Sequence, residues 1–146
     1  MQIDRKRLSW GYLAIAVAAL IGTWGNNVAY LDRGILGGNI AFWRDTFANP
    51  ASRSITVDIF FLALAVIVWM FLEARRLGMR MAWLYVVIGL LVAISATIPF
   101  FLFKRERALA RLAPQDAAGN LSASDLAWIA LQTLGALAYT VTTFVR

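Results

Sequence analysis

The sequence predicts an all-α integral membrane protein of four transmembrane helices, arranged as an up-down bundle with a central helical hairpin. The chain of 146 residues is 61% hydrophobic and only 15% charged, whereas soluble domains carry roughly 25% charged residues. Its apolar residues form four runs, each long enough to cross a bilayer core of about 30 Å. An arginine-rich connection of a few residues joins two of these runs, and so short a link makes them antiparallel neighbours. We therefore expect one membrane domain covering residues 1–146.

The composition excludes several kinds of chemistry. The chain has no Cys and no His, which removes disulfides, thiol nucleophiles and the usual zinc, copper and haem ligands. We therefore expect no metal site and no cofactor. The net charge of +6 is typical of arginines that contact anionic lipid head groups. Because no soluble domain remains to present a basic patch, we expect no nucleic-acid binding.

The first predicted span covers residues 8–29. This run is longer than the apolar region of a cleaved signal peptide, which has only about 7–15 residues, so a retained helix is favoured. Small or polar residues recur every four positions on one of its faces, which favours close helix packing: Ala14, Ala18, Gly22 and Asn26. Asn26 and Asn27 place amides near the far end, where we expect a hydrogen bond between helices and keep a ligand contact as the alternative.

A short interfacial helix is predicted over about residues 39–48, after glycines that are expected to break the preceding helix. Asn49 and Pro50 then supply an N-cap and a first helical residue for a second span over residues 53–74. The third span is predicted over 81–103, with a kink at Pro99, which cannot donate a backbone hydrogen bond.

The connection between the second and third spans is a charged elbow, residues 73–80. Glu73 and Arg76 stand three residues apart and are expected to pair across one helical turn. Arg75, Arg76 and Arg80 are expected to contact lipid head groups, and Gly78 suits the residue after a helix end.

The fourth span is predicted over residues 123–145. Ser122 followed by Asp125 is the pattern of a capping box at a helix start. Four straight spans place residues 1–7, the elbow and Arg146 on one side of the membrane. Each side then carries seven lysines and arginines, so the positive-inside rule gives no orientation. We place the N-terminus in the cytoplasm, because the first helix usually dominates.

Asp58 is the one carboxylate inside an apolar run. An ionisable residue within a span is a functional hypothesis by default, although Asp58 lies only two turns after Pro50 and also suits an interfacial or packing role. Glu73 lies about 22 Å further along the same helix, too far to act with Asp58 on one bond. An intramembrane acid–base enzyme acting on an isoprenoid or lipid would use Asp58, with Asn26 or Asn27 and Tyr85 lining the site.

Several segments resemble a bacterial family of small membrane proteins known as domain of unknown function 2834. The resemblance covers about residues 10–108, and the fourth span looks like an addition to a three-span pattern. It implies the architecture of those spans but no activity. The segments that carry it are Phe47-Ala-Asn-Pro-Ala-Ser52, Asp58, Trp69, Glu73-Ala-Arg-Arg-Leu-Gly-Met-Arg80, Trp83-Leu84-Tyr85, Pro99-Phe-Phe-Leu102 and Arg105-Glu-Arg107.

The small-residue faces and the absence of catalytic clusters favour a non-enzymatic role. We expect an inner-membrane protein that packs against itself, binds a membrane protein partner or holds membrane lipids. The alternatives are the intramembrane enzyme described above and a component of a transporter.

Overall fold

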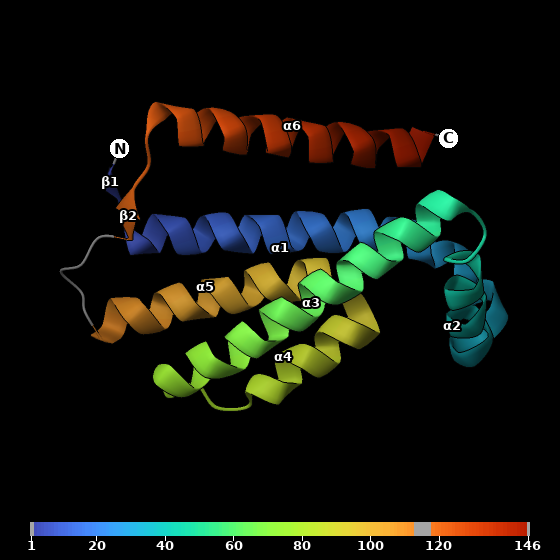
Figure 1. Ribbon diagram of the computed structural model, residues 1–146, viewed down its shortest axis with the longest axis horizontal. Helices are drawn as coiled ribbons and strands as arrows, with labels where there is room; N and C mark the ends of the chain where they lie inside the picture. Colours follow the sequence, from blue (N-terminus) through green and yellow to red (C-terminus); the bar gives the residue numbers. More distant parts are fainter. Residues whose placement is uncertain (1, 113–117, 146) are drawn as a thin grey trace.

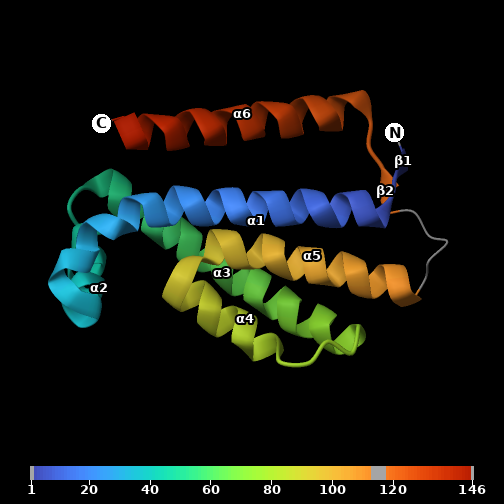
Figure 2. The same ribbon diagram turned by 180° about the vertical axis from the view of Figure 1, so that it is seen from behind.

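The computed structural model describes residues 2–112 and 118–145, and these are almost entirely helical. In chain order the elements are β1 (Gln2–Ile3), α1 (Arg5–Asn27), η1 (Val28–Arg33), α2 (Gly34–Asp45), α3 (Pro50–Arg76), α4 (Ala82–Ile88), η2 (Gly89–Ala93), α5 (Ile94–Leu112), β2 (Gly119–Asn120) and α6 (Ala123–Val145). Here η1 is a 3₁₀ helix and η2 is a π-helical turn. Figures 1 and 2 show the long helices side by side, with α2 lying across one end of the bundle.

Four helical segments are long and apolar enough to cross a membrane, as the sequence predicts. By length and composition they are Arg5–Asp45, Pro50–Arg76, Ala82–Leu112 and Ala123–Val145. Large apolar side chains cover most of the outer surface, which is typical of helices that face lipid rather than water.

The predicted start and end signals of α3 are confirmed. The Asn49 side chain accepts a hydrogen bond from the backbone N–H of Ser52 at 2.9 Å, and Pro50 is the first helical residue. At the other end Gly78 has φ +62°, a left-handed conformation that glycine adopts without steric cost. The backbone N–H of Met79 donates to the carbonyl of Ala74 at 2.8 Å and so closes the helix end.

The short helix that the sequence predicts at the interface begins earlier than expected. α2 runs from Gly34 to Asp45 rather than over residues 39–48, and two glycines expected to break helix lie inside it. Gly38 is buried against η1, and a Cβ added there would lie 2.4 Å from the carbonyl oxygen of Tyr30. This glycine therefore allows a close approach of two backbone segments.

The third apolar run reverses direction, so the predicted up-down bundle is corrected here. α4 leads away from the elbow, η2 turns the chain, and α5 returns alongside α4 (Figures 1 and 2). The rings of Tyr85 and Phe101 lie 5.4 Å apart between centroids, although a straight helix would separate them by about 24 Å. Pro99 lies inside α5, so the change of direction precedes the position at which the sequence predicts a kink.

The fourth predicted span corresponds to α6, and its capping box is confirmed. The backbone N–H of Ser122 donates to the Asp125 carboxylate at 2.9 Å, and the N–H of Asp125 donates to the Ser122 hydroxyl at 3.2 Å. β2 pairs with β1 in antiparallel register, which fixes the start of α6 beside the start of α1. Since α6 then runs parallel to α1, its last described residue, Val145, lies at the end of the molecule opposite the N-terminus (Figure 1).

The sequence analysis placed the end of the fourth span on the same side as the N-terminus. The direction of α6 corrects this placement. The prediction assumed that the third run crosses the bilayer, whereas its reversal returns the chain to the end from which it came. Arg146 itself lies outside the described residues.

The buried core lies between α3, α4 and α5. It is centred on Met70, Ala74 and Phe101, of which Ala74 and Phe101 have no exposed surface. Partly buried apolar residues pack against this centre: Val66, Met79, Ala82, Tyr85 and Ile98. The core thus holds the returning helix α5 against the elbow.

Candidate functional site: a basic end built on two buried glutamates

The first half of the site is the end of α3, where Glu73 faces inward. Its carboxylate receives two hydrogen bonds of 2.6 Å from Arg76, one turn further along. The predicted pairing of these two residues is therefore confirmed. Glu73 is only 7% exposed, and its second partner comes from a distant part of the chain.

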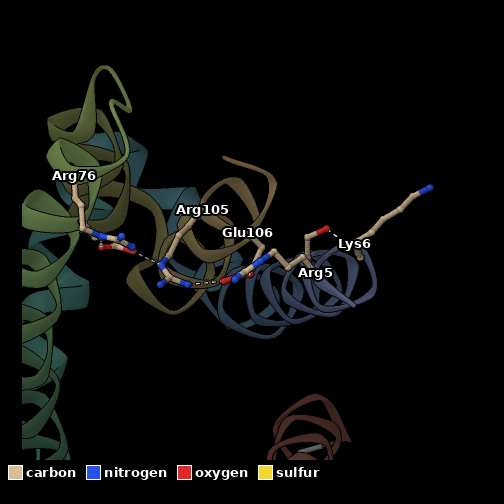
Figure 3. A network of polar contacts seen from close by, with 7 residues as sticks. Arg5, Lys6, Arg76, Arg105 and Glu106 are labelled. Atoms are coloured by element: carbon tan, nitrogen blue, oxygen red, sulfur yellow. Dashed lines mark hydrogen bonds and ion pairs between the residues drawn. The ribbon is translucent and has the colours of Figure 1, made fainter. Parts of the chain in front are cut away.

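The second half of the site is the end of α5. Arg105 donates to Glu73 at 2.6 Å from Nε, and its Nη1 pairs with the neighbouring Glu106. Glu106 in turn accepts from Arg5 at the start of α1 at 2.9 Å. Figure 3 shows Arg76, Arg105, Glu106 and Arg5 in one row. This row of ion pairs, the "arginine–glutamate network", ties α3, α5 and α1 together.

The network is polar but fully satisfied. Glu106 is 2% exposed, and in the part of the chain that the structure describes no buried side-chain nitrogen or oxygen lacks a partner. A buried carboxylate without a partner would cost several kcal/mol, so each of these glutamates requires its arginine partners. The guanidinium of Arg105 also lies over the ring of Trp69, 5.8 Å from its centroid, a cation–π contact.

Exposed cations surround the network. We define the basic end as the end of the molecule where α1 and α6 begin and α3 and α5 end (Figure 1). Ten of the thirteen described lysines and arginines lie here, and all except Arg5 and Arg105 are exposed: Arg5, Lys6, Arg7, Arg75, Arg76, Arg80, Lys104, Arg105, Arg107 and Arg111. Lys6, for example, extends away from the helices in Figure 3.

The acids do not balance this charge. The basic end carries four of the seven described acids, which are Asp4, Glu73, Glu106 and Asp125. The opposite end and the adjacent part of α3 carry Arg33, Arg44 and Arg53 together with Asp32, Asp45 and Asp58. Among the described residues the basic end therefore has a net charge of +6, and the remainder of the molecule has none.

The other residues predicted for a site do not gather in one place. Asn26 donates to the Thr143 hydroxyl of α6 at 3.2 Å, which is a contact between helices, and Asn27 ends α1. Tyr85 packs against the ring of Phe101 between α4 and α5. Asp58 is exposed on α3. The described residues contain no group of three or more His, Cys, Asp or Glu side chains that could hold a metal ion.

Sequence reasoning missed Arg5, Arg105 and Glu106 as members of one cluster. Straight spans place residues 104–107 on the side of the membrane opposite Arg5 and Glu73, so these side chains could not be brought together. The sequence contained one signal for this cluster. Glu73 and Glu106 each lie in an arginine-rich segment that follows an apolar run. If both segments had been placed on the same side of the membrane, each acid would have been expected to pair with arginines of either segment.

An apolar groove lies along one face of α1. Its volume is about 470 Å³, and it is lined by Trp10, Leu13, Ala14, Val17, Ala18 and Ile21. On the predicted small-residue face of α1, Ala14 and Ala18 line this groove, whereas Gly22 and Asn26, further along the helix, contact α6. There a Cβ at Gly22 would lie 3.2 Å from Thr140, and one at Gly25 would overlap the ring of Phe144.

Comparison with known proteins identifies the family. A model of the family described as "Protein of unknown function DUF2834" matches residues 12–107. The chain belongs to this family. The DUF2834 match begins inside α1 and ends inside α5, so it includes Glu73, Arg105 and Glu106 but not Arg5, and it leaves α6 outside, as the sequence resemblance indicated. No curated protein and no solved structure matches the chain.

Proposed function

We propose that the protein is a non-catalytic, multi-pass protein of the bacterial inner membrane whose basic end binds anionic lipid head groups. One observation carries this proposal: the return of α5 adds four cations to the six that α1 and the elbow place at the same end, around two glutamates that already have partners. Among the ion pairs of the described residues, only Arg76 of the eight exposed cations pairs with one of these glutamates. The surplus charge of +6 therefore faces outward.

The expected strength follows from the number of cations. A lysine or arginine close to an anionic leaflet contributes about 1 kcal/mol, so eight of them supply several kcal/mol even after partial screening by salt. The planar guanidinium also binds phosphate through two parallel hydrogen bonds. Trp10 and Trp83, 54% and 55% exposed at the same end, suit the head-group level.

The test compares lipid compositions. The purified full chain is placed in nanodiscs of phosphatidylcholine alone or with added phosphatidylglycerol, and thermal unfolding is followed by circular dichroism. We expect the anionic lipid to raise the midpoint, because a ligand that binds the folded state stabilises it. Added salt should reduce this rise.

A matched pair of variants assigns the effect to the basic end. The Arg75→Gln/Arg80→Gln variant should lose a large part of the rise, whereas Arg33→Gln/Arg44→Gln at the opposite end should keep it. Equal midpoints in both lipids, or an equal loss in both variants, would contradict the proposal. Mass spectrometry of co-purified lipids gives an independent readout, and a purely zwitterionic set would count against it.

A second candidate, association with a second copy or with another membrane protein, is favoured by α6. No described residue of α6 is buried, and this helix contacts α1 mainly through its second half. An interface on α6 would bury small residues of the kind that pack helices in membranes. Cross-linking in nanodiscs tests this candidate, since a strictly monomeric protein would remove it.

A further inference from the structure

The third apolar run is too short to cross a bilayer in either of its two parts. Residues 82–93 extend about 18 Å as helix, and α5 has only the ten residues 94–103, about 15 Å, before its first charged residue, Lys104. A bilayer core is about 30 Å thick. The run as a whole has the length and hydropathy of a span, but its reversal brings its two ends to the same end of the molecule (Figure 1).

Contacts of its returning part, α5, hold the hairpin in this form. Phe101 of α5 is fully buried against Met70 and Ala74 of α3. Arg105 reaches Glu73 at the end of α3, although 32 residues separate them in sequence. Both contacts would be lost if residues 82–105 formed one straight helix, because Arg105 would then lie about 34 Å from Ala82.

The turn at the tip of the hairpin is compatible with a lipid environment. Backbone groups inside a bilayer need internal partners, and the chain stays helical through η2. The carbonyl oxygen of Val92 accepts a hydrogen bond from the indole N–H of Trp24 in α1 at 3.2 Å. The hydroxyl of Thr97 donates to the carbonyl of Ala93 at 2.9 Å.

The hairpin changes the distribution of charge between the two sides of the membrane. With four straight spans each side carries seven lysines and arginines. With the hairpin, ten of the thirteen described cations lie at the basic end and three at the opposite end. Lysines and arginines concentrate on the cytoplasmic side of membrane proteins. A ten-to-three distribution therefore favours a cytoplasmic basic end, whereas the equal distribution of four straight spans favoured neither orientation.

We propose that residues 82–105 form a re-entrant hairpin that enters from the cytoplasmic side. The chain then crosses the membrane three times, through α1, α3 and α6. Its N-terminus and the end of α5 lie in the cytoplasm, and the end of α6 lies on the opposite side. This inference depends on insertion into the membrane but not on lipid head-group binding, so the two proposals fail separately.

The absence of cysteine in the chain makes single-cysteine labelling a direct test. The full-length variants Ala48→Cys, Leu112→Cys and Val145→Cys are expressed in bacterial cells, and spheroplasts are treated with a membrane-impermeant maleimide before and after disruption. All three positions are exposed. Ala48→Cys is the reference, because both topologies place it on the side opposite the N-terminus.

We expect Ala48→Cys and Val145→Cys to react in intact spheroplasts, and Leu112→Cys only after disruption. Four straight spans require the reverse pairing, with Leu112→Cys reacting together with Ala48→Cys. The proposed topology is overturned if Leu112→Cys is labelled in intact spheroplasts together with Ala48→Cys. It is also overturned if Ala48→Cys and Val145→Cys are not both labelled under the same condition. Protection of Ala48→Cys in intact spheroplasts overturns the proposed orientation. Ala123→Cys at the start of α6 is a second variant that must behave like Leu112→Cys.

Discussion

Replacing Glu106 by glutamine tests whether the arginine–glutamate network holds the helix ends together. The substitution keeps the shape of the side chain but removes the charge that pairs with Arg5 and Arg105. Breaking a buried ion pair by changing one partner costs about 3–5 kcal/mol, because a charge is left without compensation. The side chains of Arg5 and Arg105 are 16% and 24% exposed, so water reaches them partly and we expect a smaller loss, of about 2–3 kcal/mol.

The loss is measurable as a shift in thermal unfolding. For chains of this size 1 kcal/mol corresponds to about 2–4 °C in Tm, so the Glu106→Gln variant should unfold about 4–12 °C below the parent protein in mild detergent. Asp32→Asn removes an exposed carboxylate at the opposite end and serves as the control. Its free energy of unfolding should change by less than about 0.5 kcal/mol.

A double-mutant cycle identifies the contact responsible. The Arg5→Gln/Glu106→Gln variant should lose less stability than the two single variants lose together, because the second change removes a partner that is already gone. A Glu106→Gln midpoint equal to that of Asp32→Asn would refute the reasoning, as would additive losses in the cycle. Either result would mean that the network forms without contributing to the docking of α1, α5 and α3.

Two further predictions concern close contacts between segments. Gly38→Ala should lower the midpoint of thermal unfolding by several degrees, because its Cβ would lie 2.4 Å from a backbone carbonyl oxygen. Gly37→Ala should leave this midpoint unchanged or raise it, because alanine stabilises a helix relative to glycine. Equal shifts in the two variants would contradict the prediction. The Gly22→Cys/Thr140→Cys variant should form an intramolecular disulfide under mild oxidation, because a Cβ at Gly22 would lie 3.2 Å from the Thr140 side chain. The control variant Gly22→Cys/Trp128→Cys should form none. The opposite result, detected by gel mobility with and without reductant, would mean that α6 runs antiparallel to α1.

Features that depend on neighbouring residues were readable from the sequence alone. The N-cap at Asn49, the capping box at Ser122 and the helix-ending Gly78 each act over three or four residues. The pairing of Glu73 with Arg76 also spans one helical turn, so spacing predicts it directly. Four apolar runs of sufficient length likewise follow from composition, because the bilayer sets the length that a spanning helix needs.

The direction of the third run was decided only by the tertiary structure. Hydropathy reports that residues 81–103 are apolar and long enough to cross, but it contains no information on whether the chain continues or returns. The return depends on contacts between residues far apart in the sequence, Phe101 with Met70 and Arg105 with Glu73. Those same contacts assemble the network and bring the four cations of α5 to the end that already carries six. The sequence by itself thus determined which segments are helical and apolar, and long-range packing determined which of their charged ends meet.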